Sequence, residues 1–234
     1  MEFKKLHAPS LKDLFIKEME TLILSGKLVI GERLPPEREL AKSMQVSRAV
    51  VNAGITDLSR KGFLTIKPRI GTFVADYRRN GTMETLMSIM NYNGGRLRDE
   101  EIRSILELRI ALDTLAVELL IPKITDQEAA VLKGYVLKMG EAKSPAAASE
   151  YAFLFQHELA CLSGNTLLPL IFSSFKSPIT TLWERFYQLY GLEALYNNTA
   201  VLCGYIERRD VKKAVEWINK SIDDTIKGNR QIYY

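Results

Sequence analysis

The feature that most constrains this fold lies in the first third of the chain, where two short helical segments meet at a tight break. Pro35 and Pro36 predict the start of the first segment, which extends to about Met44. Ser47 is a typical N-cap for the second segment, which ends before Gly62. Because the letters MQVS leave room only for a compact turn, the pair predicts a helix-turn-helix.

Two short runs rich in β-branched and aromatic residues follow these helices. FLTI and GTFVA, separated by KPRI, predict a two-stranded hairpin. Another helix comes first in the chain, with Ser10 as its N-cap, apolar residues at helical spacing and Gly26 at its end. Residues 1–76 therefore predict a winged helix-turn-helix domain.

The rest of the chain predicts helices alone. DYRRNGTM is polar and contains the turn pair Asn80-Gly81, so we place a linker at residues 77–82. Residues 83–234 then predict six to seven amphipathic helices separated by Gly and Pro, including one helix from 167 to 190. The expected fold class is mainly α, with a small β-hairpin in the first domain and an all-α bundle in the second.

Charge separates the two predicted domains. Residues 1–76 hold 13 basic and 9 acidic residues, a net charge of +4, while residues 77–234 hold 19 of each. This asymmetry favours a first domain that binds a polyanion. No apolar run approaches the ~18–20 residues of a membrane span, and the N-terminus lacks the apolar core of a signal peptide. With two cysteines outside any CxxC spacing, we expect a cytoplasmic protein without a membrane partner.

The second helix of a helix-turn-helix presents its first turns to base edges in the major groove. Arg48 suits a bidentate pair with guanine. Asn52 could bind an adenine or a phosphate, and Ser47 at the helix start suits a phosphate. A solvated surface position is the commoner role for any one of them, but together with the basic wing they predict DNA binding. The expected DNA-binding residues are Arg38, Ser47, Arg48, Asn52, Lys67, Arg69 and Thr72.

The same segment resembles the winged-helix signature of the GntR family of transcriptional regulators. The shared motifs are Gly31, Leu34-Pro35, Glu37 to Ala41, Val46 to Arg48, Leu58 to Gly62, and Gly71 to Val74. The chain departs from the family at Asn52, where an Arg is common, and at Arg69, where the wing usually has a Gly nearby. The resemblance implies a homodimer whose two recognition helices bind a palindromic operator in double-stranded DNA.

The second domain is similar to the FCD-type effector domain of the FadR subfamily. The segments that show this similarity are ELRIALDTLAVELL, HELACLSGNTLL and YIERRDVKKAVEWINKSI. Two further segments resemble the fatty-acyl-responsive members, namely YRRNGTMETL and WERFYQLY. Most FCD domains hold a divalent metal with an Asp and three His. The corresponding residues here are Phe153, His157, Thr199 and Ser221, and the only other histidine is His7. We therefore expect neither a metal nor another cofactor.

We expect a metal-free pocket for a small-molecule effector, either a carboxylate or an acyl thioester such as acyl-CoA. Arg109 interrupts an apolar helix, where it either pairs with Asp113 or faces inward to anchor an anion. The FadR resemblance places Arg109 and Tyr190 near the acyl-CoA region. His157 is either a buried polar group satisfied by a neighbour or one wall of the pocket. The expected effector-binding residues are Arg109, His157, Tyr190, Thr199 and Ser221.

The favoured function is a ligand-responsive transcriptional regulator, acting as a dimeric repressor whose effector changes the spacing of its DNA-binding heads. Two alternatives stay open. One is a DNA-binding regulator without an effector, which a filled second domain would favour. The other is an enzyme that uses His157 and Cys161, which the lack of a Gly-rich loop, a nucleophile elbow and oxyanion donors disfavours.

Overall fold

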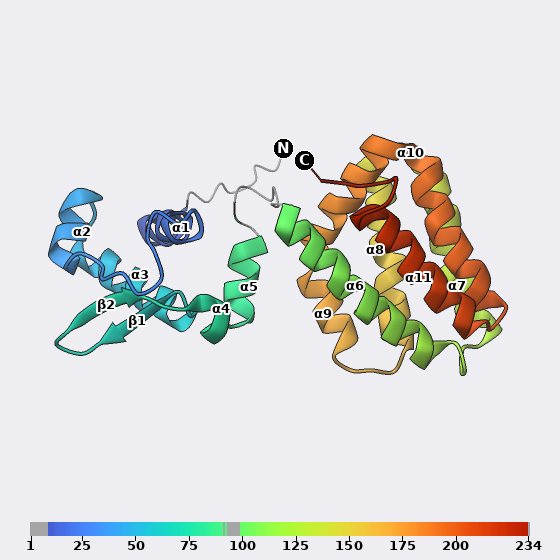
Figure 1. The fold of residues 1–234 in the computed structure, drawn as a ribbon, viewed down its shortest axis with the longest axis horizontal. Helices are drawn as coiled ribbons and strands as arrows, with labels where there is room; N and C mark the ends of the chain where they lie inside the picture. The colour runs from blue at the N-terminus through green and yellow to red at the C-terminus, as the bar shows by residue number, and fades with distance from the viewer. Residues whose placement is uncertain (1–8, 91, 93–98, 234) are drawn as a thin grey trace, which may run out of the picture. The chain divides into compact units, whose positions relative to one another are not determined.

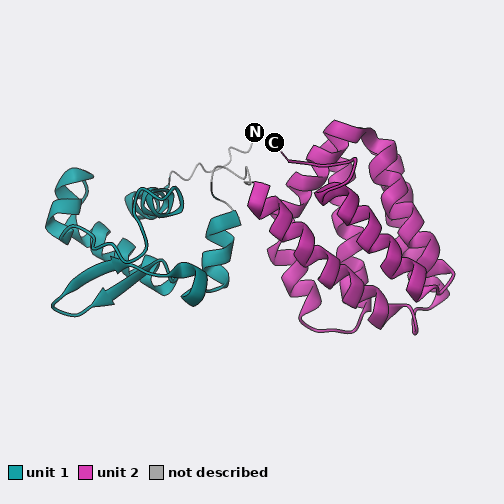
Figure 2. Cartoon of the chain, viewed as in Figure 1, with its two compact units in different colours: residues 1–96 teal, residues 97–234 magenta. Residues whose placement is uncertain are grey.

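The computed structural model of the chain describes residues 9–90, 92 and 99–233 and divides into two compact units, 1–96 and 97–234 (Figures 1 and 2). Within these residues the secondary structure is helical except for one two-stranded antiparallel sheet in the first unit. This confirms the predicted class, a winged helix-turn-helix followed by an all-α bundle. No helix in the described ranges is both long and apolar enough to cross a membrane.

The first unit forms from signals close together in the sequence. Its main elements are α1 (Leu11–Leu24), α2 (Glu37–Ser43), α3 (Arg48–Arg60), β1 (Leu64–Lys67) and β2 (Gly71–Val74). Ser10 starts α1 with a capping box, in which its hydroxyl and the Asp13 carboxylate satisfy each other's backbone N–H groups. The Ser47 hydroxyl accepts the Val50 N–H at 3.2 Å and starts α3. The turn between α2 and α3 includes Gln45 in a left-handed conformation, with φ of 54°.

The hairpin closes one side of this unit. Leu64 pairs with Val74 at its base and Lys67 with Gly71 near its tip. Leu64 and Val74 are buried in the core that α1 and α3 form, whereas the tip is exposed. Arg69 at the tip has a φ of 64°, the left-handed conformation that glycine adopts most readily. Its side chain therefore lies at the end of an exposed turn.

A close approach between α1 and α3 predicts the effect of one substitution. A Cβ added to Gly54 on α3 would overlap the buried ring of Phe15 on α1. Gly54→Ala is therefore expected to destabilise the first unit by about 1–3 kcal/mol, the usual cost of overpacking. Gly134→Ala on α7 (Asp126–Gly140) is the matched control, because nothing lies within 4 Å of that Cβ. It should stabilise its unit by about 0.5–1 kcal/mol, and calorimetric unfolding of both variants would measure the two shifts.

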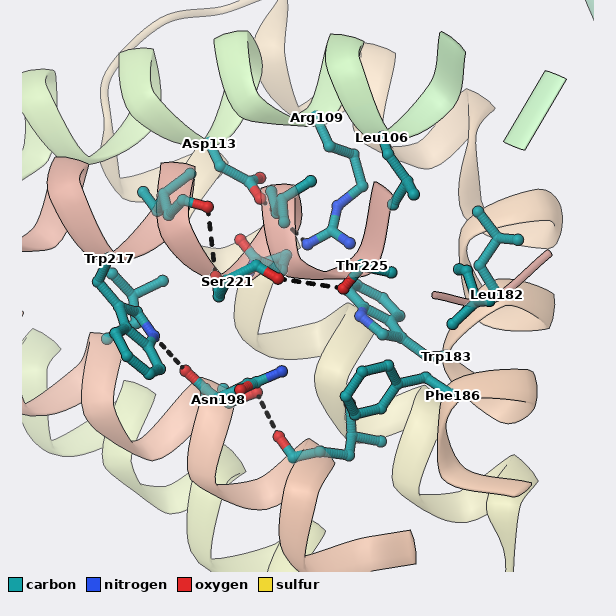
Figure 3. A pocket seen from close by; sticks show the side chains of 17 residues that line it. Leu106, Arg109, Asp113, Leu182, Trp183, Phe186, Asn198, Trp217, Ser221 and Thr225 are labelled. Carbon is teal, nitrogen blue, oxygen red and sulfur yellow. Dashed lines mark hydrogen bonds and ion pairs between the residues drawn. The ribbon is translucent and has the colours of Figure 1, made fainter. Parts of the chain in front are cut away.

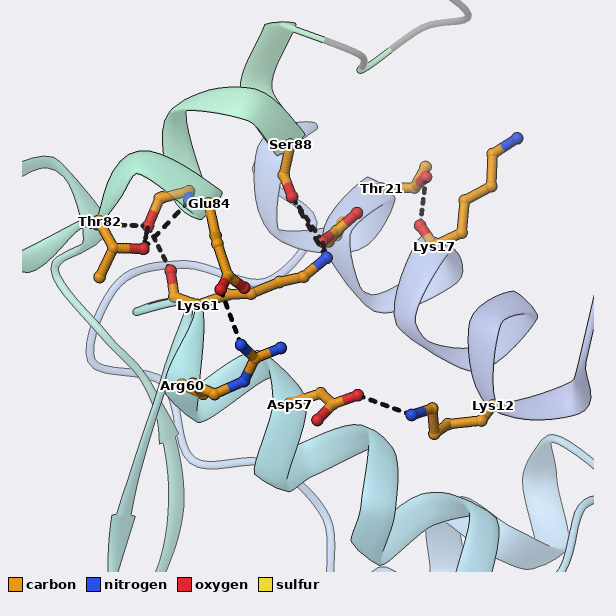
Figure 4. A network of polar contacts seen from close by, with 11 residues as sticks. Lys12, Lys17, Thr21, Asp57, Arg60, Lys61, Thr82, Glu84 and Ser88 are labelled. Atoms are coloured by element: carbon orange, nitrogen blue, oxygen red, sulfur yellow. Dashed lines mark hydrogen bonds and ion pairs between the residues drawn. The ribbon is translucent and has the colours of Figure 1, made fainter. Parts of the chain in front are cut away.

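The segment after the wing belongs to the first unit, which differs from the predicted linker at 77–82 and the predicted start of the second domain at 83. Tyr77–Asn80 form the short helix α4, and Met83–Met90 form α5. Polar contacts attach α5 to α1 and α3, as Figure 4 shows. Ser88 donates to Glu20 at 2.8 Å, Glu20 pairs with Lys61 at 2.9 Å, and the Thr85 hydroxyl donates to the Lys61 carbonyl. The boundary between the compact units therefore lies at residues 96 and 97.

The second unit is a bundle whose described helices are α6 (Asp99–Leu120), α7 (Asp126–Gly140), α8 (Pro145–Leu162), α9 (Leu168–Ser174), α10 (Lys176–Glu207) and α11 (Val211–Ile226). Thr125, Ser144 and Asp210 cap three of them with their side chains. The helix predicted from 167 to 190 is instead interrupted at Phe175, between α9 and α10. At Gly191, with φ of 82° and ψ of 170°, the backbone leaves the helical conformation, so α10 consists of two helical stretches that meet at a kink.

Candidate DNA interface and ligand cavity

The N-terminal ends of α2 and α3 present basic side chains to solvent. Arg38 lies in the first turn of α2 and Arg48 is the first residue of α3, and both are exposed. Neither side chain forms a salt bridge with any residue that the structure describes. By contrast, Arg60 at the other end of α3 pairs with Glu84 at 2.7 Å. Arg38 and Arg48, two of the three arginines predicted to contact DNA, are therefore available to bind an external anion.

The hydrogen bonds of Ser47 and Asn52 determine which of their side-chain atoms remain available to bind DNA. Ser47 uses an oxygen lone pair to accept from Val50, so its O–H stays available as a donor. Asn52 is exposed, and its Nδ2 donates to Glu37 Oε1 at 3.2 Å, which links α3 to α2. Sequence reasoning missed this contact, because residues 15 positions apart meet only through the packing of the two helices.

The wing presents two further basic residues. Lys67 and Arg69 are exposed, and the Lys67 ammonium lies 4.8 Å from the centre of the Phe73 ring. Thr72 is half-buried, and its backbone carbonyl accepts the Leu34 N–H at 2.9 Å. Thr72 thus fixes the wing to the segment before α2, whereas the two basic residues are the exposed part of the tip.

The second unit encloses a cavity of about 60 Å³ between α6, α8, α10 and α11 (Figure 3). Arg109 and Asp113 project into it from α6, Trp183 and Phe186 come from α10, and Ser221 comes from α11. The other residues around it are Leu106, Gln156, Leu182, Leu195, Asn198, Thr199, Leu202, Trp217, Ile218, Ile222, Thr225 and Ile232. The lining therefore combines apolar walls with polar and charged side chains from α6, α8, α10 and α11.

A buried ion pair lies at one wall of the cavity. Arg109 Nη2 donates to Asp113 Oδ2 at 3.1 Å, and the two residues are only 9% and 1% exposed. The Arg109 guanidinium also lies 4.7 Å from the centre of the Trp183 ring. Burial raises the pKa of the Asp113 carboxyl, and the positive charge of Arg109 opposes that rise. The pair is thus held in a desolvated site, where its charges interact more strongly than in water.

Three polar atoms around the cavity are buried without a hydrogen-bond partner in the part of the chain that the structure describes. They are Arg109 Nε, Asp113 Oδ1 and Gln156 Oε1. Each belongs to a residue that lines the cavity. Because more than nine in ten buried polar groups in proteins are hydrogen-bonded, these atoms leave hydrogen-bonding capacity in the cavity that a water or a ligand could use.

The structure brings together three of the five predicted effector residues. Arg109, Thr199 and Ser221 line the cavity, whereas His157 and Tyr190 do not. His157 Nε2 lies 3.0 Å from Ser173 Oγ, and the Tyr190 hydroxyl donates to the Gln231 carbonyl at 2.6 Å. These two polar groups are satisfied outside the cavity, which corrects their expected placement in the pocket.

The missed cavity residue on α8 is Gln156, the neighbour of His157. Gln156 lines the cavity, and His157, which points about 100° further round the helix, does not. Gln156 is 7% exposed in an apolar stretch of helix, and this polar interruption was the available signal. Its orientation could not be deduced from α8 alone, because Tyr151 to Leu162 is apolar on several faces.

The four positions at which the FCD resemblance implies metal ligands do not fit a divalent cation. The Phe153 ring stacks on His157 with 5.5 Å between centroids and has no donor atom. Thr199 and Ser221 line a cavity that does not include His157. One imidazole and two separate hydroxyls lack the nitrogen, sulfur and carboxylate donors that such a metal prefers.

The two cysteines do not have the properties of activated nucleophiles. Cys161 Sγ lies 3.7 Å from His157 Nδ1, but partial burial and the charge of Glu158 raise the pKa of the Cys161 thiol. Burial raises the pKa of the Cys203 thiol to about 11. Since a reactive cysteine has a lowered pKa, this pairing gives no support to the enzyme alternative.

Two family models match this chain. The model described as "Bacterial regulatory proteins, gntR family" matches residues 15–74, and the FCD domain model matches residues 104–224, about half of the chain. The first match covers α1 to the end of the wing, and the second lies within the helical bundle.

Named relatives agree with these matches. The HTH-type transcriptional regulator Mce2R of Mycobacterium tuberculosis is 26% identical over 161 residues, covering 69% of this chain and 67% of that protein. The HTH-type transcriptional regulator LutR of Bacillus subtilis is 27% identical, and the match covers 63% of this chain and 65% of LutR. The fatty acid metabolism regulator protein of Shewanella halifaxensis is 29% identical, and the match covers 66% of this chain and 63% of that protein. The matches thus span about two thirds of each relative.

A solved structure shares the fold. It is described by the words "Lar controls the expression of the Listeria monocytogenes agr system and mediates virulence" and has a TM-score of 0.62 at 14% identity. The similarity covers 94% of this chain and 97% of that one. At this identity the likeness concerns the fold alone.

Proposed function

This chain belongs to the GntR family of bacterial regulatory proteins, with an FCD domain in its second unit, and from that premise we propose a more specific function. The protein binds a two-fold-symmetric DNA operator as a homodimer and acts as a repressor. A small organic acid in the cavity of the second unit lowers its affinity for the operator. The broader statement, a DNA-binding transcriptional regulator with an effector domain and not an enzyme, follows from the family and its relatives.

The observation that supports the DNA-binding surface is the exposed Arg48 at the start of α3, which forms no ion pair with the described residues. A recognition helix places its first turn against base edges, and an arginine there suits the two acceptors of guanine. Arg38 and the Lys67 and Arg69 of the wing supply further positive charge for phosphates or the minor groove. Binding should therefore weaken steeply as the salt concentration rises.

The homodimer is supported by an apolar stripe on the exposed face of α6. Leu108, Leu115 and Leu119 are 41%, 38% and 39% exposed, and Leu112 lies between them. Their spacing puts all four on one side of the helix. An exposed apolar stripe of this kind marks a surface that another protein covers, and a second copy also supplies the second recognition helix that a symmetric operator requires.

Leu115→Glu tests this arrangement. A charge in the middle of the stripe is expected to prevent association, because it would be buried without a partner. Light scattering should then show a monomer, and operator affinity should fall because one recognition helix binds alone. Val131→Glu is the matched control, because Val131 is an apolar residue on α7 outside the stripe and is at least as exposed as Leu115. A dimeric Leu115→Glu protein would contradict the assignment of the interface.

A small acid suits the cavity better than an acyl thioester. A cavity of about 60 Å³ holds roughly four to six waters at about 10–15 Å³ each. Coenzyme A, with its nucleotide and long pantetheine arm, is far larger. Arg109 supplies a donor for a carboxylate. Its Nε has no hydrogen-bond partner among the described residues, which argues against the alternative of a filled, effector-free domain.

Selection of wild-type protein on a random pool of duplex DNA tests the DNA-binding half of this proposal. The pool should become enriched in a two-fold-symmetric sequence. Adding small carboxylates to a gel shift on that sequence then tests the effector half, with release of DNA as the expected result. An asymmetric consensus would contradict binding as a symmetric dimer, and release by no acid would contradict the effector.

A further inference from the structure

The cavity presents acceptors that a simple carboxylate cannot satisfy. A carboxylate would accept from Arg109 Nε, but it has no proton to donate to Asp113 Oδ1 or Gln156 Oε1. Both of these oxygens are buried without a donor in the described residues, in side chains that are 1% and 7% exposed. Leaving them unsatisfied is unfavourable, because each oxygen has lost its contact with water without gaining a donor.

The hydroxyls around the cavity add further acceptors. The Thr199 hydroxyl donates to the backbone carbonyl of Leu195 at 3.3 Å. The Ser221 hydroxyl donates to the backbone carbonyl of Ile218 at 3.2 Å, and the Thr225 hydroxyl to the backbone carbonyl of Ser221 at 3.1 Å. Because a hydroxyl has one proton, each of these three oxygens offers only lone pairs to a ligand. The lining therefore offers several acceptors to a ligand that donates hydrogen bonds, beside the donors of Arg109, Gln156 and Asn198.

Charge balance leads to the same requirement. Arg109 and Asp113 form a pair without net charge at the cavity wall. A carboxylate alone would add one negative charge to this desolvated site, with Asp113 already close by, whereas a ligand with one charge of each sign would add none. The carboxylate of such a ligand would face Arg109 and its cation would face Asp113.

We propose that the effector is a small amino acid, bound through its carboxylate to Arg109 and through its ammonium group to Asp113 and Gln156. This inference rests on the proposed function, in which the effector occupies this cavity. An ammonium has three protons, so it satisfies Asp113 Oδ1 and Gln156 Oε1 and keeps one for a lining hydroxyl. The size of the cavity and its apolar walls of Leu106, Leu195 and Leu202 restrict the side chain to a few atoms.

Calorimetric titration of the full chain with matched probes tests the proposal. The probes are glycine with acetate, L-alanine with propionate, and L-serine with 3-hydroxypropionate, where each second member lacks only the amino group. At least one amino acid should bind, and roughly 10–100-fold more tightly than its partner, as expected for charge-assisted hydrogen bonds. Equal affinity within every pair, or no binding of any of the three amino acids, would overturn the proposal.

Asp113→Asn supplies a readout that loss of folding would not imitate. An amide in place of the carboxylate removes the counter-charge of the ammonium and leaves Arg109 free for an anion. The variant should therefore bind propionate more tightly than L-alanine, a reversed preference. His157→Gln is the control, because His157 does not line the cavity, and its preference should match the wild type. A variant Asp113→Asn that keeps the wild-type preference would refute the placement of the ammonium.

The two proposals fail in different ways. If propionate or acetate binds and releases operator DNA while the amino acids do not, the proposed function stands and the amino-acid inference falls. If the amino acids bind but leave operator affinity unchanged, the ligand class stands and the proposed regulation falls.

Discussion

Arg48→Ala is expected to weaken operator binding by roughly 30-fold or more, since a dimer would lose two arginine–guanine pairs worth about 1–3 kcal/mol each. Arg48 is exposed at the start of α3 and forms no ion pair with the residues that the structure describes, so its removal should not disturb the fold. Fluorescence anisotropy at about 150 mM salt, in the range where phosphate contacts alone bind weakly, would measure the loss.

Arg60→Ala is the matched control for this experiment. Arg60 is the last residue of the same helix and pairs with Glu84 rather than facing the proposed groove. The exposed pair contributes at most about 1 kcal/mol to stability, so operator affinity should stay close to that of the wild type. If Arg48→Ala and Arg60→Ala bind equally well, α3 does not read the operator in the proposed way.

Arg109→Met is expected to destabilise the second unit by about 3–5 kcal/mol, because it leaves the Asp113 carboxylate buried without its counter-ion. The double variant Arg109→Met with Asp113→Leu should regain most of this stability, since apolar side chains of similar volume replace a buried ion pair at little cost. Urea unfolding followed by tryptophan fluorescence reports on this unit alone, because both tryptophans of the chain, Trp183 and Trp217, lie in it.

The pH dependence gives a second check on Arg109→Met. Burial raises the folded pKa of Asp113 above its unfolded value, so the folded state holds the proton more tightly. Stability from this group is then present at low pH and is lost as the pH rises through the interval between the two pKa values. Without Arg109 to oppose it, the folded pKa rises further and the interval widens. The difference in free energy of unfolding between the wild type and Arg109→Met should therefore shrink as the pH falls toward about 4, where the carboxyl of the unfolded chain also begins to bind a proton.

The two unfolding results are independent of any ligand. If Arg109→Met unfolds at the same urea concentration as the wild type, the ion pair is not buried as described. If the double variant is no more stable than the single one, the loss comes from packing around Trp183 rather than from an unpaired charge.

The sequence by itself determined the winged helix-turn-helix, because its signals are local. Ser10 and Ser47 cap helices through backbone N–H groups three residues away, and Gly62 lies just after α3 with φ of 79°. The strand pair from Leu64 to Val74 follows from β-branched residues on either side of a turn. Each of these interactions joins residues that are close along the chain, so the pattern of letters is sufficient.

Only the tertiary structure decided which polar side chains share the cavity. Gln156 faces it and His157 does not, although both lie in the same apolar helix, and Tyr190 is bound instead to the C-terminal segment at Gln231. Likewise, α5 joins the first unit through Glu20, more than 60 residues earlier in the chain. A helix with apolar residues on several faces has no fixed orientation until its neighbours pack against it. The direction of a polar side chain on such a helix is therefore a property of the whole bundle.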